Sequence, residues 1–177
     1  MRLSFLLACL LTLAAFPALA AEDTRPAVGT APPDIFGKDK DGNPVALSGH
    51  PDKVVIITFW ASWCGPCLRE LPVLDKIRRA VGSEHLEVIA VNFEEPRRDF
   101  LRIVRELPDS PLTWVHDRKG RIAEAYGVKA LPNMFIVDRD GTISSRHIGY
   151  GESSIQKIAG EMLALLPPEA LARPAGQ

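Results

Sequence analysis

Apolar residues follow two alternating patterns along the chain, nearly continuous runs and helical spacings. The runs at residues 54–59 and 86–91 predict strands that are buried on both faces. Apolar residues at helical spacing follow each run, over residues 68–81 and 100–107. Gly82 is a suitable end for the first of these helices. This part of the chain therefore predicts two successive strand–helix units.

Shorter elements complete the pattern on either side. Residues 34–47 contain two apolar stretches around the turn-rich segment Lys-Asp-Lys-Asp-Gly-Asn, which predicts a β-hairpin. The later elements are a strand at 113–115, a short helix at 122–126, a hairpin at 134–148 and a last helix at 155–166. After the first hairpin, the order β-α-β-α-β-α-β-β-α places the chain in the α/β class.

The first 21 residues differ in composition from the rest. Arg2, the apolar stretch after it and the small residues around Ala20 predict a secretory signal peptide over residues 1–20. An uncleaved membrane anchor remains open on length, since the apolar segment covers 19 residues. A lipid-modified Cys9 also remains open, because residues 6–9 resemble a bacterial lipobox. An exported protein is the prediction that these readings share.

The remaining sequence predicts one folded domain between two irregular ends. The Pro-rich residues 21–33 predict an extended lead-in, residues 34–166 the domain, and residues 167–177 a disordered tail. With 177 residues, 46% hydrophobic and 24% charged, the chain can bury a core without disulfide staples. A net charge of −1 gives no broad attraction to nucleic acid, which is not an expected partner.

Cys64 and Cys67 are the pair that remains if Cys9 leaves with the signal peptide. Export would expose this pair to an oxidising compartment, in which a disulfide can form. A loop closed across two intervening residues adds little stability through chain entropy. The pair is therefore better explained by chemistry than by a contribution to the fold.

The position of the cysteines supports thiol–disulfide exchange. They lie between a predicted buried strand and the start of a predicted helix. Unpaired N–H groups and the positive dipole end favour a thiolate there, so we expect Cys64 to be exposed, with a lowered pKa. Cys67, one turn further in, is placed to attack a mixed disulfide formed by Cys64. Pro66 suits the first helical turn.

Metal binding is the main competing explanation for the pair. A structural zinc site needs four ligands, and the four histidines are scattered singly, so no metal or cofactor is expected. Cu(I) binding by the two thiolates remains open as a different class of function. A thiol peroxidase also remains open, although its reactive cysteine normally lies in a dedicated pocket.

Residues 59–67 resemble the active-site segment of thioredoxins, and residues 130–132 resemble the loop that holds their cis-proline. The resemblance covers about residues 27–165. It implies a thioredoxin-like fold with a central mixed β-sheet flanked by helices. It also implies that Pro132 is cis and keeps a substrate strand beside Cys64. The substrate-binding residues that it implies are Trp63, Gly65, Pro66 and Leu131.

The departures from thioredoxin resemble the periplasmic TlpA/ResA type. Thr58 replaces the buried Asp of thioredoxins, and residues 96–115 fit an added helix and strand. These relatives place a glutamate near the cysteines, after the second core strand. Glu95 is the better match and Glu94 the alternative, and this carboxylate would accept a proton from the buried thiol. Alternatively, both acids only favour the start of the next helix.

Gly65-Pro66 is the thioredoxin dipeptide and has no histidine to stabilise the thiolate strongly. We therefore expect a reductant, with a potential on the order of −270 mV. The resemblance implies protein disulfides of the periplasm as substrates, for example apocytochrome c or metallochaperone thiols. It also implies a membrane-bound electron donor, and we expect a monomer.

Overall fold

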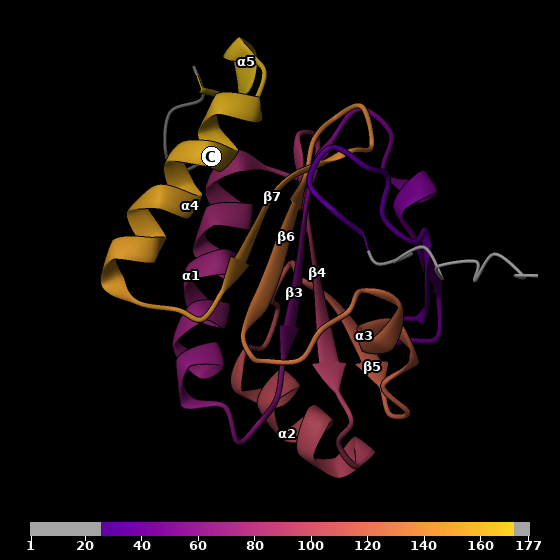
Figure 1. Ribbon diagram of the computed structural model, residues 1–177. Coiled ribbons are helices and arrows are strands. Elements are labelled where there is room, and N and C mark those ends of the chain that lie inside the picture. Colours follow the sequence, from indigo (N-terminus) through magenta and orange to yellow (C-terminus); the bar gives the residue numbers. More distant parts are fainter. Residues whose placement is uncertain (1–25, 172–177) are drawn as a thin grey trace, which may run out of the picture.

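The computed structural model describes residues 26–171, and a five-stranded sheet organises them (Figure 1). The strands lie in the order β5-β4-β3-β6-β7. Their bounds are β3 (Val54–Trp60), β4 (Leu86–Phe93), β5 (Thr113–Asp117), β6 (Asn133–Val137) and β7 (Ile143–Ile148). β3, β4 and β5 are parallel, whereas β6 runs antiparallel to both of its neighbours. The sheet is mixed, as the resemblance implied.

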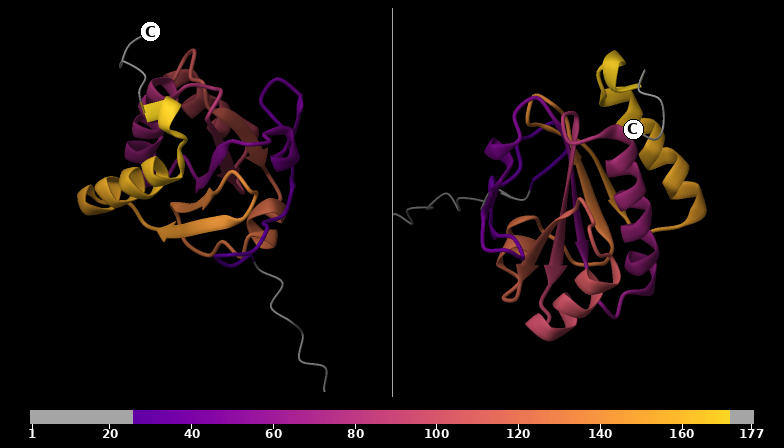
Figure 2. Two further views of the ribbon diagram at one scale, coloured as in Figure 1. Left: turned by 90° about the horizontal axis from the view of Figure 1, so that it is seen from above. Right: turned by 180° about the vertical axis from the view of Figure 1, so that it is seen from behind.

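Helices cover both faces of this sheet (Figure 2). The first face carries α1 (Gly65–Val81), α2 (Arg97–Glu106) and α4 (Glu152–Leu165). The second carries α3 (Arg121–Ala125) and the hairpin of β1 (Ile35–Lys38) and β2 (Pro44–Ala46), which is followed by η1 (Leu47–Gly49). The predicted hairpin and the predicted order of strands and helices are confirmed.

Alternation along β3 divides its side chains between two hydrophobic cores. Ile56 and Trp60 belong to the core under α1 and α2, whereas Ile57 and Phe59 belong to the core under α3 and the hairpin. All seven residues of β3 are buried, as its continuous apolar run predicts. Thr58 is the polar exception, and it is fully buried.

The prediction of a disordered tail is wrong directly after α4. A short helix, α5 (Pro168–Leu171), follows there, and Ala170 is buried in the core that also contains α1. Pro168 fits the first helical turn because its fixed φ is already helical and no N–H is needed there. Residues 1–25 and 172–177, and with them the predicted signal peptide, lie outside the described residues.

The described part of the lead-in, residues 26–33, contains no helix or strand. It is nevertheless tied to the domain, because Gly29 N donates to Ile143 O at 2.8 Å and Tyr126 Oη donates to Pro33 O at 2.6 Å. None of the helices in the described part of the chain combines the length and apolar composition that a membrane span needs.

Candidate active site

Cys64 and Cys67 form a disulfide at the N-terminus of α1, with their Cα atoms 5.3 Å apart. Cys64 is the residue before the first helical turn, and its Sγ accepts a hydrogen bond from Cys67 N at 3.3 Å. Gly65 and Pro66 form the start of the helix, where the missing N–H of proline leaves no bond unmade. The predicted position of the pair between β3 and α1 is confirmed.

The expectation that Cys64 is exposed is wrong for this disulfide form. Cys64 is 5% exposed and Cys67 is fully buried. The bond to Cys67 and the hydrogen bond from Cys67 N turn the Cys64 sulfur toward the helix. Trp63, which is 69% exposed, is instead the prominent side chain of this turn.

The loop before β6 lies beside the end of β3, because Asn133, the first residue of β6, pairs with Phe59. The Leu131–Pro132 peptide bond is cis, as predicted. Pro132 O accepts a hydrogen bond from Gly149 N at 2.8 Å, and Arg146 donates to Asn133 Oδ1 at 3.0 Å. Leu131 is half-buried against both hydrophobic cores. These contacts fix the loop from β7, the strand that ends next to it.

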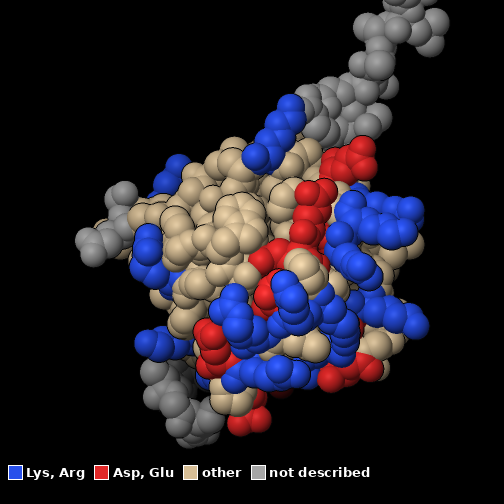
Figure 3. Space-filling view, turned by 90° about the horizontal axis from the view of Figure 1, so that it is seen from below, with Lys and Arg blue, Asp and Glu red and all other residues tan. Residues whose placement is uncertain are grey.

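The surface at this end of the sheet is partly uncharged and partly charged. Seen from below, an uncharged area adjoins a region in which many Lys and Arg side chains lie among Asp and Glu (Figure 3). Trp63 and Ile148, at the ends of the β3–α1 turn and of β7, are exposed apolar side chains at 69% and 63%. This end of the molecule therefore offers apolar contact area close to the disulfide.

Glu95 lies near the cysteines but is already occupied by other partners. Its Oε2 accepts hydrogen bonds from Ser62 N at 2.7 Å and from Asn92 Nδ2 at 2.6 Å. Its Oε1 accepts a short hydrogen bond from Ser62 Oγ. Glu95 is 5% exposed, whereas Glu94 is exposed, so Glu95 is the one of the two that faces the site. The N-terminus of α2 has no side-chain capping hydrogen bond.

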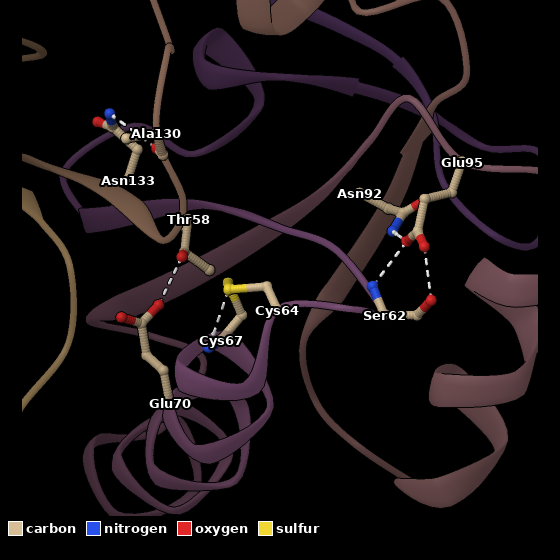
Figure 4. Close-up of a disulfide and its surroundings, with 9 residues drawn as sticks. All are labelled: Thr58, Ser62, Cys64, Cys67, Glu70, Asn92, Glu95, Ala130 and Asn133. Carbon is tan, nitrogen blue, oxygen red and sulfur yellow. Dashed lines mark hydrogen bonds between the residues drawn. A yellow bond between two sulfur atoms is a disulfide. The ribbon is translucent and has the colours of Figure 1, made fainter.

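A second buried carboxylate, Glu70, was not predicted from the sequence. It lies on α1 three residues after Cys67, is 2% exposed and accepts a hydrogen bond from Thr58 Oγ1 at 2.6 Å. Residues three apart on a helix are neighbours on one face. In Figure 4, Thr58 and Glu70 lie on one side of the disulfide and Ser62 and Glu95 on the other.

The electrostatic state of Glu70 suits proton exchange near neutral pH. Burial raises the pKa of Glu70 to about 7, against a smaller lowering by the hydrogen bond from Thr58. Tyr150 lies within electrostatic reach, since burial first and the charge of Glu70 second raise the pKa of its hydroxyl. A carboxyl group with a pKa near ambient pH can both accept and return a proton.

Two signals in the sequence point to Glu70. Thr58 is a polar residue inside an otherwise apolar strand, and such a side chain requires a hydrogen-bond partner when buried. Glu70 falls on the helix face defined by Cys67, Leu71 and Leu74. The two residues are twelve positions apart, so only the packing of α1 on β3 brings them together.

Within residues 26–171, no group of three or more His, Cys, Asp or Glu side chains is arranged to hold a metal ion. The site therefore consists of a disulfide at a helix N-terminus, a cis-proline loop and two buried carboxylates. With the sulfur chemistry supplied by Cys64 and Cys67, this arrangement can exchange a disulfide with another thiol pair.

The fold and the site define a thioredoxin-like thiol–disulfide oxidoreductase. Residues 28–146 match the model of the AhpC/TSA family, and the chain belongs to that family.

Named relatives agree with this class. The thiol–disulfide oxidoreductase ResA of Geobacillus thermodenitrificans is 34% identical over 124 residues, which cover 69% of this chain and 70% of the relative. The thioredoxin-like protein YneN of Bacillus subtilis is 32% identical over 123 residues, covering 68% and 71%. The crystal structure of a putative thiol:disulfide interchange protein DsbE from Chlorobium tepidum superposes with a TM-score of 0.74 at 31% identity, covering 79% of this chain and 98% of that one.

Proposed function

We propose that the chain is an exported reductant of protein disulfides, in which Cys64 attacks and Cys67 resolves. The observation that carries the proposal is the disulfide at the N-terminus of α1, with Cys64 before the helix and Cys67 fully buried inside its first turn. A thiolate is stabilised at such a helix end, and the outer cysteine of the pair is the one that a partner can reach.

The reaction has two steps. The Cys64 thiolate attacks a substrate disulfide, forms a mixed disulfide and releases one substrate thiolate, which takes up a proton. Cys67 then loses its proton and attacks Cys64 Sγ, which forms the Cys64–Cys67 disulfide seen here and releases the second substrate thiolate. The substrate gains two electrons, and a membrane-bound thiol donor returns two electrons to the protein.

We assign the proton acceptor for Cys67 to Glu70 rather than to Glu95. Glu70 follows Cys67 by one helical turn, and its pKa of about 7 leaves it partly ionised at neutral pH. The carboxylate oxygens of Glu95 are already engaged by Ser62 and Asn92. Thr58 holds Glu70 on the buried side of α1, at the strand position that resembles the buried Asp of thioredoxins.

Substrates are proposed to be proteins that contact the loop of Pro132 and the exposed Trp63. Gly65 and Pro66 lie between the two cysteines at the start of α1, and Leu131 packs against the core that contains both cysteines, which supports their assignment to substrate binding. Apocytochrome c and metallochaperone thiols are the substrate classes that the TlpA/ResA resemblance implies. Export rests on the amino-terminal residues 1–20, whose composition is that of a signal peptide.

Disulfide reduction tests the proposal. Reduced protein should cleave insulin disulfides with dithiothreitol as the recharging reductant, and Cys64→Ser should abolish the reaction. A redox titration should give a potential on the order of −270 mV. A potential above about −150 mV would contradict the reductant direction, because it approaches the strong-oxidant range.

A further inference from the structure

The loop that carries Cys64 is held by one side chain from the opposite edge of the site. Residues 61–64 connect β3 to α1, and Ser62 in this loop donates both its backbone N–H and its hydroxyl to Glu95. Asn92 Nδ2 supplies a third donor to the same carboxylate. An ionised carboxylate is an acceptor only, and hydrogen bonds to it are about twice as strong as those between neutral groups.

The backbone of Glu95 is itself fixed by the neighbouring strand. Glu94 has a φ of 49°, a left-handed conformation that turns the chain at the end of β4, and its N–H donates to Asp117 O at 3.0 Å. Glu95 O lies 2.8 Å from His116 Nε2. A carbonyl oxygen only accepts, so Nε2 carries the proton of this hydrogen bond.

Helix α2 and strand β5 are therefore connected through Glu95 to the loop of residues 61–64. The His116 ring of β5 stacks on Phe100 of α2, with ring centroids 5.0 Å apart. Asn92 comes from β4, and its register partner in β3 is Trp60, the last residue before this loop. Residues of β4, β5 and α2 thus hold Glu95, and Glu95 in turn holds Ser62.

The importance of this tie depends on the redox state. In the disulfide form, the bond to Cys67 and the hydrogen bond from Leu68 N to Cys64 O at 3.1 Å fix Cys64 from the helix side. Reduction removes the covalent bond, so the hydrogen bonds from Ser62 to Glu95 and from Cys64 N to Ala61 O at 3.1 Å then carry more of the placement of Cys64. Attack on a substrate occurs from this dithiol form, and a misplaced reacting group can cost a hundredfold in rate.

We propose that Glu95 is a positioning residue that keeps the loop of Ser62, and with it Trp63 and Cys64, in place for attack on protein substrates in the dithiol form. This inference rests on the proposed disulfide reduction. Protein substrates must align with the loop, whereas a small disulfide needs only the sulfur. Loss of the tie therefore acts mainly on reactions with proteins.

The test uses Glu95→Gln and Ser62→Ala, with Glu94→Gln as the matched control. The control makes the same chemical change one residue away, on an exposed side chain. Glu95→Gln should lower kcat/KM for insulin reduction about tenfold to a hundredfold and change the reaction with the small disulfide dithiobis(nitrobenzoate) less than about threefold. Ser62→Ala should give a smaller loss, and the double variant should be no slower than Glu95→Gln alone.

A spectroscopic signal tests the position of the loop without any turnover. Trp63 is 69% exposed, whereas Trp60 and Trp114 are buried, so iodide quenches mainly the emission of Trp63. The anisotropy of this quenchable emission should fall in Glu95→Gln and in Ser62→Ala in the dithiol form, and stay near the wild-type value in Glu94→Gln. Far-ultraviolet circular dichroism checks that each variant is folded.

Three results separate the possible failures. Equal behaviour of Glu95→Gln and Glu94→Gln would overturn the positioning role. So would unchanged anisotropy in Glu95→Gln together with loss of the pH dependence of the Cys67 step, since that pattern belongs to a proton acceptor. Wild-type protein that does not reduce insulin refutes the proposed function instead, and the anisotropy then still decides whether Glu95 holds the loop.

Discussion

The two sides of the disulfide carry carboxylates that are equally buried but differently bonded. Glu70, on the α1 side, is 2% exposed and accepts one hydrogen bond, from Thr58. Glu95, on the β4 side, is 5% exposed and accepts three, from Ser62 and Asn92. Burial alone therefore does not assign a role. Three donors hold the carboxylate of Glu95 in place, whereas burial with a single donor raises the pKa of Glu70.

Each of the two carboxylates is associated with a different cysteine. Glu70 belongs to the helix that contains Cys67, and Glu95 holds the loop that leads to Cys64. We infer that Glu70 accepts the proton of the resolving thiol and that Glu95 positions the attacking thiol. Variants on each side of the disulfide test these two roles.

The largest expected effect is that of Glu70→Gln on the resolving step. Removal of a general base typically costs about a hundredfold or more, and the amide cannot take the proton of Cys67. Stopped-flow release of substrate from a preformed mixed disulfide at Cys64 should slow by about that factor and lose its dependence on pH near 7. Glu169→Gln, at an exposed position on α5, is the control. If Glu70→Gln kept wild-type kinetics and Glu95→Gln showed this loss, Glu95 rather than Glu70 would be the proton acceptor for Cys67.

An effect of comparable size is expected on stability as a function of pH. The pKa of Glu70 is about 7 in the folded protein against 4.5 for an ordinary glutamate, so the folded state holds the proton more tightly. Its contribution is fully present below pH 4.5 and is lost as the pH rises through about 7. The oxidised protein should lose about 3 kcal/mol of unfolding free energy over this range. Urea titrations should show the loss in the wild type and not in Glu70→Gln.

The smallest expected effect is that of Thr58→Val, which removes the hydroxyl that donates to Glu70 with little change of shape. The hydrogen bond lowers the pKa of Glu70, so its loss should raise that pKa above about 7 and move the midpoint of the rate–pH profile upward. The unfolding free energy should fall by about 1 kcal/mol. Ser62→Ala, on the other side of the disulfide, should leave the midpoint unchanged; a shift there would mean that the two sides are not separate.

The sequence allowed most of the fold to be predicted because its local signals agree. The apolar runs of β3 and β4, the helical spacing after Cys67 and the end at Gly82 all specify the same strand–helix order. The resemblance to thioredoxin added what local patterns do not contain, namely the mixed sheet and the cis bond before Pro132.

The parts that escaped prediction depend on contacts between distant residues. A glutamate on an amphipathic helix normally faces solvent, and Glu70 is buried because Thr58 of β3 lies opposite it. The burial of Cys64 follows from the disulfide itself, and α5 forms where Ala170 meets the core. Such features are set by tertiary packing, which a single sequence does not display residue by residue.

Trapping with the single-cysteine variants tests the central claim most directly. Reduced Cys67→Ala and Cys64→Ala proteins would each be mixed with a disulfide-containing protein substrate, and the covalent adducts would be mapped by mass spectrometry. We predict a stable mixed disulfide at Cys64 in Cys67→Ala and almost none at the buried Cys67 in Cys64→Ala. Equal trapping by both variants, or trapping through Cys67 alone, would contradict the account.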